Sequence, residues 1–268
     1  MLEDKIKGGL IKIKAIVLAA GYATRLYPLT RDTPKPLLEV NGKPMMDYIM
    51  EKLEGIGVTD VFVVTNSKFY KPFKAWADNY KGHVDNLDVI DDGTTSNEDR
   101  LGAIGDMKYV LDEKGINDDL LVIGADNLFD FSLGKAYGLF KEVGEPVVMA
   151  YDVKDYTLAR QYGLLEVSSE GRITGFQEKP ENPTTTLASM CAYFYPKKTV
   201  PLIYKYLKEG NKPDSPGNFP AWLVKENLPV YAAVHEGKWF DIGSFESLKA
   251  AKEAFGEENV DVEALKKG

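Results

Sequence analysis

The stretch of sequence that decides the fold is Lys14–Lys43, KAIVLAAGYATRLYPLTRDTPKPLLEVNGK. It opens with an apolar run, Ala15–Ala19, which predicts a buried strand, and it breaks at Gly21 into a long loop before apolar residues resume at Leu37. A buried strand that leads through a small-residue turn into a cationic loop is how an α/β protein presents backbone N–H groups to a phosphate. Such connections usually span about 2–6 residues, and longer ones are disproportionately functional. The alternative is an ordinary connection with solvated Arg and Lys side chains.

The charge of the chain restricts what it binds. Its formal net charge is −8, which argues against nucleic acid as the main partner. A phosphate-bearing ligand therefore needs local positive charge to overcome the field of the whole protein. The loop supplies that sign, because between Gly21 and Lys43 the cations outnumber the acids: Arg25, Arg31, Lys35 and Lys43 against Asp32 and Glu39.

Length and composition indicate one large domain. The 268 residues, 44% of them hydrophobic, suffice for a single core, which we assign to 13–268 behind a polar N-terminal extension, 1–12. No apolar run approaches the ~20 residues that span a bilayer, and the N-terminus lacks a signal-peptide pattern, so we expect no membrane partner and a cytoplasmic location. The one cysteine, Cys191, lies in an apolar run and is predicted to be a buried thiol without a disulfide partner. The oligomeric state stays open, a homo-oligomer included.

Apolar strands alternate with helical patterns through the first half of the chain. Continuous apolar runs at 60–66, 87–90 and 120–124 predict buried strands, which indicates a mostly parallel sheet covered by helices on both faces. After Pro146 the chain is richer in strands, predicted at 147–153, 190–195, 230–234 and 239–242, with a hairpin of 162–167 and 172–178. Helices are predicted at 46–53, 69–80, from 101 onward, and at 199–207, 221–227 and 245–255, with a loop at 211–219.

Polar features follow the predicted strands at the points where these end. Ligands of open α/β sheets bind beyond the carboxyl ends of the strands, where three features fall: the loop 21–35, the polar loop 91–102 and the pair Asp126-Asn127. Asp126 follows an apolar strand and Asp241 precedes a helix, so each is interpreted as either a helix cap or a metal ligand. Two such carboxylates suit an oxygen-seeking ion such as Mg²⁺. Only two histidines and one cysteine in the chain argue against zinc.

The segment Glu178-Lys179-Pro180 ends a predicted hairpin strand. Because proline restricts the residue before it, we expect Lys179 to be extended, with its amine pointing in a fixed direction. An exposed hairpin lysine without a ligand is the alternative interpretation.

Several of these segments together resemble one enzyme family. The run Leu18-Ala19-Ala20-Gly21-Tyr22-Ala23-Thr24-Arg25-Leu26, followed by Pro28-Leu29-Thr30 and Pro34-Lys35-Pro36-Leu37-Leu38, is similar to the signature of the sugar-1-phosphate nucleotidylyltransferases. Gly124-Ala125-Asp126-Asn127, Tyr162-Gly163, Glu178-Lys179-Pro180 and Trp239-Phe240-Asp241-Ile242-Gly243 resemble the later motifs of that family, in the family's order. The resemblance runs from about Ile13 to Phe255. The hexapeptide repeats that some relatives carry are not found before Gly268, so a bifunctional enzyme is not expected.

The resemblance implies a fold, a reaction and a set of site residues. The fold would be α/β, a Rossmann-like αβα sandwich with a mostly parallel central mixed sheet and a β-rich second half, and 13–268 would form a single nucleotidyltransferase domain. The reaction would be Mg²⁺-dependent transfer of a nucleotidyl group from a nucleoside triphosphate to a sugar-1-phosphate, which releases pyrophosphate and forms a nucleoside-diphosphate sugar. Arg25 and Lys35 would be catalytic, on the triphosphate and the leaving pyrophosphate, and Asp126 and Asp241 would bind Mg²⁺. The nucleotide-binding residues would be Leu18, Ala20, Gly21, Thr24, Thr94 and Gly102, and the sugar-phosphate-binding residues Asn127, Gly163, Glu178 and Lys179.

Two positions depart from the pattern of that family. Ala23 stands where a second glycine is common, so we expect a loop of slightly different shape, since alanine does not freely take a positive φ. The family commonly places a base-reading glutamine before a Gly-Leu-Ala-like helix start, and residues 91–100, DDGTTSNEDR, contain none. Uracil or thymine recognition is therefore not assumed, and cytosine or guanine stay open.

Other functions fit the sequence less well. A dinucleotide-dependent oxidoreductase needs Gly-x-Gly-x-x-Gly, and a P-loop NTPase needs Gly-Lys-Ser/Thr, but the opening turn has only Gly21 and the second motif never occurs. A metal-dependent glycosyltransferase would share the strand-end acid, yet Ala125-Asp126-Asn127 is not a paired Asp-x-Asp. A catalytically idle relative that binds a nucleotide sugar as a regulatory subunit is the alternative from another class, and the full set of charged residues argues against it.

Overall fold

The structure is a computed structural model that describes residues 13–257 and 260–267. The predicted extension, 1–12, lies outside the described residues. A nine-stranded mixed sheet runs through the described part of the chain. Its parallel part contains β6 (Asp119–Gly124), β1 (Ile13–Leu18), β4 (Asp60–Thr65) and β5 (Asn86–Asp91). The central position of β1 brings the loop that follows it to the middle of the carboxyl edge of the sheet.

The remaining strands extend the sheet on the other side of β6. β11 (Leu187–Tyr195) is antiparallel to β6 and pairs with both β8 (Val147–Asp152) and β9 (Gly163–Val167). β9 forms a hairpin with β10 (Ile173–Glu178), and β12 (Tyr231–His235) is parallel to β8. The β-rich second half therefore belongs to the same sheet as the parallel strands.

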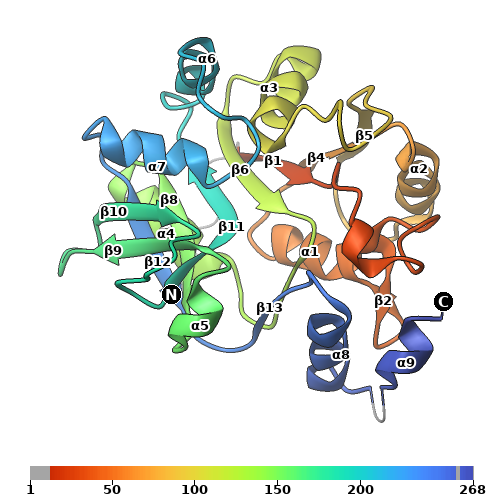
Figure 1. Cartoon of the computed structure of the whole chain (residues 1–268). Coiled ribbons are helices and arrows are strands. Elements are labelled where there is room, and N and C mark those ends of the chain that lie inside the picture. The colour runs from red at the N-terminus through yellow and green to blue at the C-terminus, as the bar shows by residue number, and fades with distance from the viewer. Residues whose placement is uncertain (1–12, 258–259, 268) are drawn as a thin grey trace, which may run out of the picture.

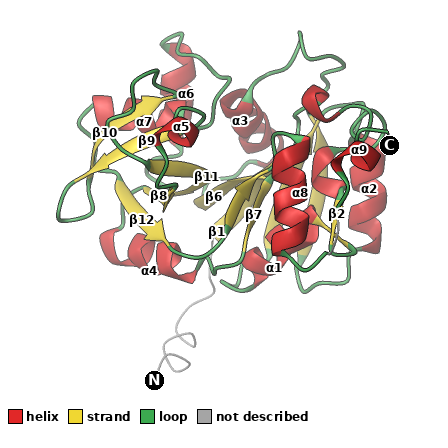
Figure 2. Ribbon diagram, turned by 60° about the horizontal axis from the view of Figure 1, so that its bottom comes forward, coloured by secondary structure: helices red, strands yellow, loops and turns green. Residues whose placement is uncertain are grey.

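Helices cover both faces of this sheet (Figures 1 and 2). Along β1 the side chains alternate, so that Ala15 and Val17 pack into one core while Ile16 packs into the other. The first core includes α1 (Met45–Glu54), α2 (Tyr70–Asn79) and α4 (Gly134–Val143), and the second includes α3 (Ala103–Lys114), α6 (Pro201–Lys208) and α7 (Asn218–Lys225). The predicted αβα sandwich is confirmed.

Short elements complete the site edge of the sheet. The loop after β1 contains two 3-10 helices, η2 (Thr24–Leu26) and η3 (Lys35–Leu37), and a small hairpin of β2 (Glu39–Val40) and β3 (Lys43–Pro44). β7 (Asn127–Phe129) pairs antiparallel with β13 (Trp239–Asp241). α8 (Phe245–Ala254) and α9 (Val262–Leu265) close the chain, and α5 (Tyr156–Ala159) precedes β9. Leu26, Met45, Leu128 and Leu248 form a third core that fixes α8 against the loop.

The helices α4, α5 and α9 and the short strands β2, β3 and β7 were not predicted from the sequence, and α7 begins earlier than predicted. The sequence patterns did not predict α4, since Gly134 and Gly138 are poor helix formers, but burial of Ala136 and Phe140 stabilises it. α7 begins at Asn218, inside the predicted loop 211–219, because burial of Phe219 adds a turn to its start. Among the described residues, no helix combines the length and the hydropathy needed to cross a membrane.

Candidate active site

The loop after β1 is held by hydrogen bonds to its own backbone and to β4. Asn66 Nδ2 donates to the Ala20 carbonyl over 2.8 Å, and the Ala19 N–H donates to the Val64 carbonyl over 2.9 Å. Ala23 takes a left-handed conformation with a φ of 48°, which contradicts the expectation that alanine would avoid it. The cost, about 1–2 kcal/mol, is offset where the Ala23 carbonyl accepts from the Leu26 N–H at 3.0 Å and from Thr30 Oγ1 at 2.7 Å. Alanine therefore keeps the turn that a glycine would make.

Lys35 joins three distant segments of the chain at one point. Its Nζ donates to Asp126 Oδ2 and to the Ile242 carbonyl, each over 2.7 Å. Only 15% of the Lys35 side chain is exposed, against 37% of the Asp126 side chain, so the lysine is largely buried while the carboxylate still faces solvent. The ammonium group of Lys35, from the loop after β1, thus forms an ion pair with Asp126, which follows β6.

Asp126 and Asp241 are brought together by the pairing of β7 with β13, in which Asn127 lies opposite Asp241. Neither acid caps a helix: Asp126 is followed directly by β7, and α8 is capped by Ser244, whose Oγ accepts from the Ser247 N–H. The helix-cap interpretation is therefore wrong for both acids. The second interpretation, metal ligation, stays a prediction.

The electrostatics of this pair fit a divalent cation. Burial and the negative charge of Asp126 raise the pKa of Asp241, against the opposing charges of Lys35, Lys179 and Arg25. Because burial disfavours the charged form, a cation bound by both carboxylates would stabilise their ionised state. Within the residues that the structure describes, no cluster of three or more His, Cys, Asp or Glu side chains completes a metal site. The two carboxylates therefore fit Mg²⁺, which commonly takes one or two carboxylates and draws its other ligands from substrate phosphates and water.

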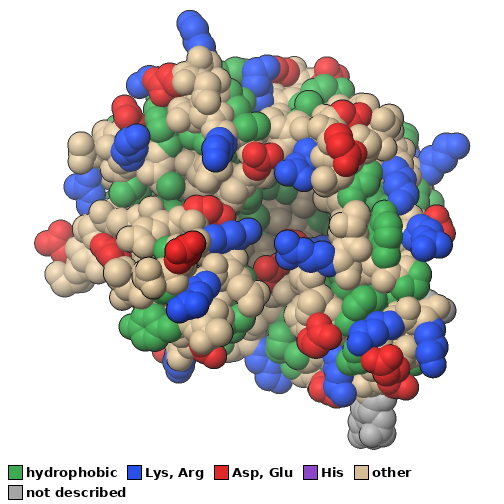
Figure 3. All heavy atoms as spheres, viewed as in Figure 1, with side chains coloured by type: hydrophobic (Ala, Val, Ile, Leu, Met, Phe, Trp, Pro, Cys, Tyr) green, Lys and Arg blue, Asp and Glu red, His purple; other side chains and the backbone are tan. Residues whose placement is uncertain are grey.

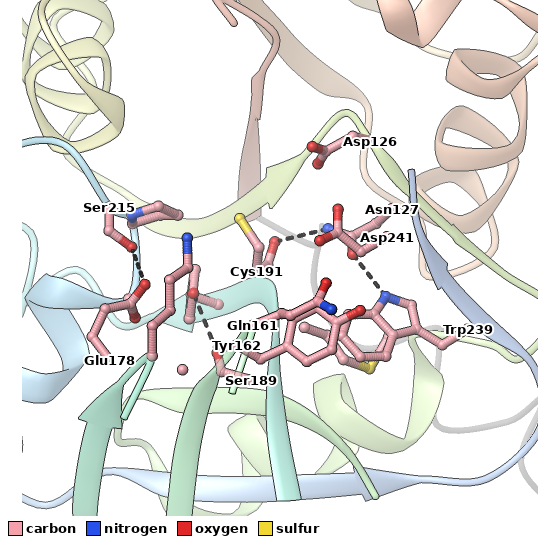
Figure 4. Close-up of a pocket in the computed structure, with 16 residues that line it drawn as sticks. Asp126, Asn127, Gln161, Tyr162, Glu178, Ser189, Cys191, Ser215, Trp239 and Asp241 are labelled. Carbon is pink, nitrogen blue, oxygen red and sulfur yellow. Dashed lines mark hydrogen bonds between the residues drawn. The ribbon is translucent and has the colours of Figure 1, made fainter. Parts of the chain in front are cut away.

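A cavity of about 220 Å³ lies on one side of the acids, and we call it the β9 cavity (Figure 4). Its wall includes Asp126, Asp241 and the predicted sugar-phosphate residues Asn127, Gly163, Glu178 and Lys179. Ser215 Oγ donates to Glu178 Oε1 over 3.0 Å, and Trp239 Nε1 donates to Asn127 Oδ1 over 2.8 Å. A Cβ at Gly163 would lie 2.8 Å from Glu178 Oε2 and 2.9 Å from the ring of Phe176, so a larger residue would displace these side chains. Glu178 and Asn127 thus each have a hydrogen-bond partner before any ligand arrives.

A second cavity lies on the other side of Asp126, and we call it the β1 cavity. It is lined by the predicted nucleotide-binding residues Leu18, Ala20, Gly21 and Gly102, together with Asp106 and Arg100. Gly102 has a φ of 78°, and a Cβ there would lie 2.8 Å from the backbone C and O atoms of Pro213. The carbonyls of Pro213 and Asp214 accept from the Ile104 and Ala103 N–H groups at 2.9 and 3.2 Å. These bonds occupy N–H groups at the start of α3 and bring the 213–214 backbone against the cavity.

Three residues line both cavities: Asp126, Cys191 and Pro216. Cys191 lies in β11 where the register with β8 shifts between Ser189 and Tyr193, and its φ is 53°. A bulge of this kind re-aims a side chain. Cys191 is half-buried at the junction rather than inside the core, and burial together with the charges of Asp126 and Asp241 raises the pKa of its thiol.

Several predicted site residues lie elsewhere. Thr24 and Arg25 are exposed on η2 and line neither cavity, although the charge of Arg25 acts on Asp241. Thr94 is buried, and both its N–H and its Oγ1 donate to Asp92 Oδ1 over 2.7 Å.

Lys179 has a φ of 47°, so the extended conformation predicted from Pro180 is wrong. Its N–H continues the hairpin by donating to the Tyr162 carbonyl over 3.0 Å before the chain turns.

The space-filling view shows how the charges are arranged around the hollow. Lys and Arg side chains reach over it from both sides, and acidic atoms lie within it (Figure 3).

Two residues of this site were missed by sequence reasoning. Ser215 has no signal in a Pro- and Gly-rich loop, whereas Asp106 is an acid placed among the buried positions Ile104, Met107 and Val110 of α3.

Residues 14–258 match the family described as nucleotidyl transferase. This chain belongs to the nucleotidyl transferase family. The resemblance to sugar-1-phosphate nucleotidylyltransferases, drawn from the sequence motifs, is thereby confirmed.

Relatives of this nucleotidyl transferase differ in the base that they are named for. A UTP–glucose-1-phosphate uridylyltransferase of Synechocystis sp. is 27% identical over 86% of this chain and 60% of its own length. A Sulfolobus acidocaldarius protein assigned as a mannose-1-phosphate guanyltransferase is 30% identical, with the same two coverages of 86% and 60%. The chain thus spans 60% of the length of these two relatives. The fold is shared with a Bacillus anthracis crystal structure, assigned as a glucose-1-phosphate thymidylyltransferase in complex with a sucrose (TM-score 0.74, 24% identity, 93% of this chain and 98% of that one).

Proposed function

We propose that this protein transfers a nucleotidyl group from a nucleoside triphosphate to a sugar-1-phosphate and releases pyrophosphate. The observation that carries the proposal is the meeting of two cavities at Asp126. Lys35 and Asp241 lie beside that acid, and Lys179 lines the β9 cavity. The β1 cavity would hold the nucleoside and the β9 cavity the sugar phosphate. An oxygen of the sugar-1-phosphate would then attack the α-phosphorus while the bond from that phosphorus to the bridging oxygen of pyrophosphate breaks.

Such chemistry needs positioning and charge neutralisation rather than a protein nucleophile. Lys35 is already oriented by two hydrogen bonds, and Arg25 would move from its exposed position on η2 to the departing pyrophosphate. Lys179 would bind the sugar phosphate, while Glu178, held by Ser215, would accept hydrogen bonds from the sugar hydroxyls. Asp126 and Asp241 would hold Mg²⁺, which when bound neutralises phosphate charge in the transition state.

A substrate matrix tests this function. The purified protein is incubated with Mg²⁺ and each combination of five nucleoside triphosphates (ATP, GTP, CTP, UTP and dTTP) with a panel of sugar-1-phosphates, and pyrophosphate release is measured. We expect release with at least one pair, and loss of that release when Mg²⁺ is removed by chelation. Release that persists without a divalent cation would reject the Mg²⁺ assignment. No release in any combination would reject the enzyme and favour the idle nucleotide-sugar-binding relative.

A further inference from the structure

Two buried acids lie at the β1 cavity, Asp106 in its wall and Asp92 behind it, and each has one oxygen without a hydrogen-bond donor among the described residues. Asp92 and Asp106 are 94% and 95% buried (6% and 5% exposed). Among the described residues, neither Asp92 Oδ2 nor Asp106 Oδ1 receives a hydrogen bond from an N–H or O–H donor. Buried polar atoms without partners are rare in proteins, so a pair of them on neighbouring side chains calls for a proton or a ligand.

A shared proton explains these two oxygens. Burial raises the pKa of Asp92, and the hydrogen bonds that its Oδ1 accepts from the Thr94 N–H and from Thr94 Oγ1 act against that rise. Burial and the charge of Asp92 raise the pKa of Asp106 to about 8, and the two carboxyls are in hydrogen-bond contact. A proton held on Asp106 and donated to Asp92 therefore accounts for both oxygens.

This arrangement fixes what Asp106 offers to the cavity. Asp106 lines the β1 cavity beside Leu18, Ala20 and Gly102, the residues expected to face the nucleoside. With its proton turned toward Asp92, its second oxygen is left as a hydrogen-bond acceptor. The shared proton leaves one negative charge on the pair of carboxyls, and this charge attracts N–H groups and repels carbonyl oxygens.

We propose that Asp106 is a specificity-determining residue that selects a nucleobase with an exocyclic amino group. This inference rests on the proposed function, because it takes the β1 cavity as the nucleoside site. Cytosine, adenine and guanine each bring amino N–H donors, whereas uracil and thymine bring one imide N–H between two carbonyls. The absence of glutamine from 91–100 agrees with this selection, since an amide, unlike Asp106, offers both a donor and an acceptor to an imide edge.

Binding of nucleotides without a sugar phosphate tests the inference separately from the reaction. Dissociation constants of CTP, GTP, ATP, UTP and dTTP are measured with Mg²⁺ by calorimetry on the full chain. For the wild type we expect the tightest amino-bearing nucleotide to bind about tenfold or more tightly than UTP and dTTP, as one hydrogen bond to a buried group allows. Equal or tighter binding of UTP or dTTP would overturn the inference.

Two substitutions at position 106 separate recognition from a structural role. Asp106→Asn can donate from its amide to Asp92 and still present a carbonyl oxygen, so the preference should stay within about threefold of the wild type. Asp106→Ala removes the acceptor and should reduce the preference about tenfold. Asp106→Leu, of similar size, replaces the alanine variant if that one does not fold. Asp112→Ala, on the exposed side of α3 where Asp112 pairs with Lys108, is the matched control and should change nothing.

The outcomes distinguish this inference from the reaction itself. An unchanged preference in Asp106→Ala or Asp106→Leu would overturn the role of Asp106, as would loss of the preference in Asp106→Asn. Selective binding without pyrophosphate release in the substrate matrix would reject the proposed reaction and leave the inference standing. Binding of no nucleotide would overturn both.

Discussion

In the β9 cavity the polar side chains hold one another, whereas the wall of the β1 cavity is formed mainly by backbone, small residues and glycine. Glu178 is bonded by Ser215, and Asn127 by Trp239, before a ligand binds. In the β1 cavity Gly102 lets the backbone of Pro213 approach. Asp106, which lines this cavity together with Asp126 and Asp214, has a buried oxygen without a hydrogen-bond donor.

The difference shows that the two sites would recognise their ligands by different means. A set of pre-bonded side chains in the β9 cavity suits a sugar, whose many hydroxyls need donors and acceptors at defined places. A closely approaching backbone suits a flat base. The shape of the cavity would then provide most of the selection, and the acceptor oxygen of Asp106 would distinguish between bases. Substitutions that affect one cavity, or both, test this contrast.

The largest effect is expected at the acids between the two cavities. Asp126→Asn or Asp241→Asn should lower the rate of pyrophosphate release by about 10³ or more, because each removes charge that would bind Mg²⁺ on the reacting phosphates. Circular dichroism and thermal melting should show a folded protein, and Asp78→Asn on the exposed surface of α2 serves as the control. Near-normal rates in either variant would reject the metal assignment.

Gly102→Ala should disturb the β1 cavity alone. The new methyl group would lie 2.8 Å from the backbone of Pro213, so α3 or the 213–214 segment must move. We expect the KM for the nucleotide to rise about 30-fold or more, an effect of about 2 kcal/mol, with little change in the KM for the sugar phosphate. Gly115→Ala is the matched control, since its φ of 58° is also positive but no atom lies within 4 Å of the added methyl. Equal effects of the two variants on nucleotide KM would contradict the close-approach argument.

Lys179→Ala should disturb the β9 cavity alone. Loss of this cation should raise the KM for the sugar phosphate about tenfold, while nucleotide binding, measured by calorimetry, should change less than about threefold. Lys208→Ala, at the end of α6, controls for a change in net charge. Equal losses for both substrates would remove Lys179 from the sugar-phosphate site.

The smallest effect concerns the stability of the protein without ligands. The pKa of Asp106 is raised from 3.8 to about 8 in the folded protein, so the folded state binds more protons than the unfolded state between these values. Stability should therefore fall as the pH rises from about 4 to 8. Because Asp106→Asn does not titrate, the Tm of the wild type should fall at least ~3 °C more than that of the variant between pH 5 and pH 8. Parallel Tm profiles would show that Asp106 is ionised and would contradict its proton-sharing with Asp92.

Much of the fold was predictable because it follows from local patterns. The apolar runs of β1, β4 and β6 fixed the parallel part of the sheet, and the loops after β1, β5 and β6 lie at its carboxyl edge as predicted. Asp126 and Asp241 were singled out by their positions at strand ends. Their proximity depends on the three-residue pairing of β7 with β13, which no periodicity in the sequence reveals.

The parts that sequence reasoning missed depend on tertiary contacts. Local rules gave the wrong φ for Ala23 and Lys179, because hydrogen bonds to more distant residues determine these conformations. The role of Ser215 depends on the contact between the loop after α6 and β10, where its hydroxyl donates to Glu178. Asp106 did leave a signal, an acid on the buried face of α3, but its partner Asp92 lies fourteen residues earlier, at the end of another element.

The segment from Pro213 to Gly217 has a consequence for how the two reactants are aligned. Its first two carbonyls hold the start of α3, its serine holds Glu178, and Pro216 faces both cavities. Under the proposed function, this single short piece of backbone would act as a spacer between the two reactants. Any change in its length would shift the base and the sugar relative to each other, so this loop has less freedom to vary than its surface position and its composition indicate.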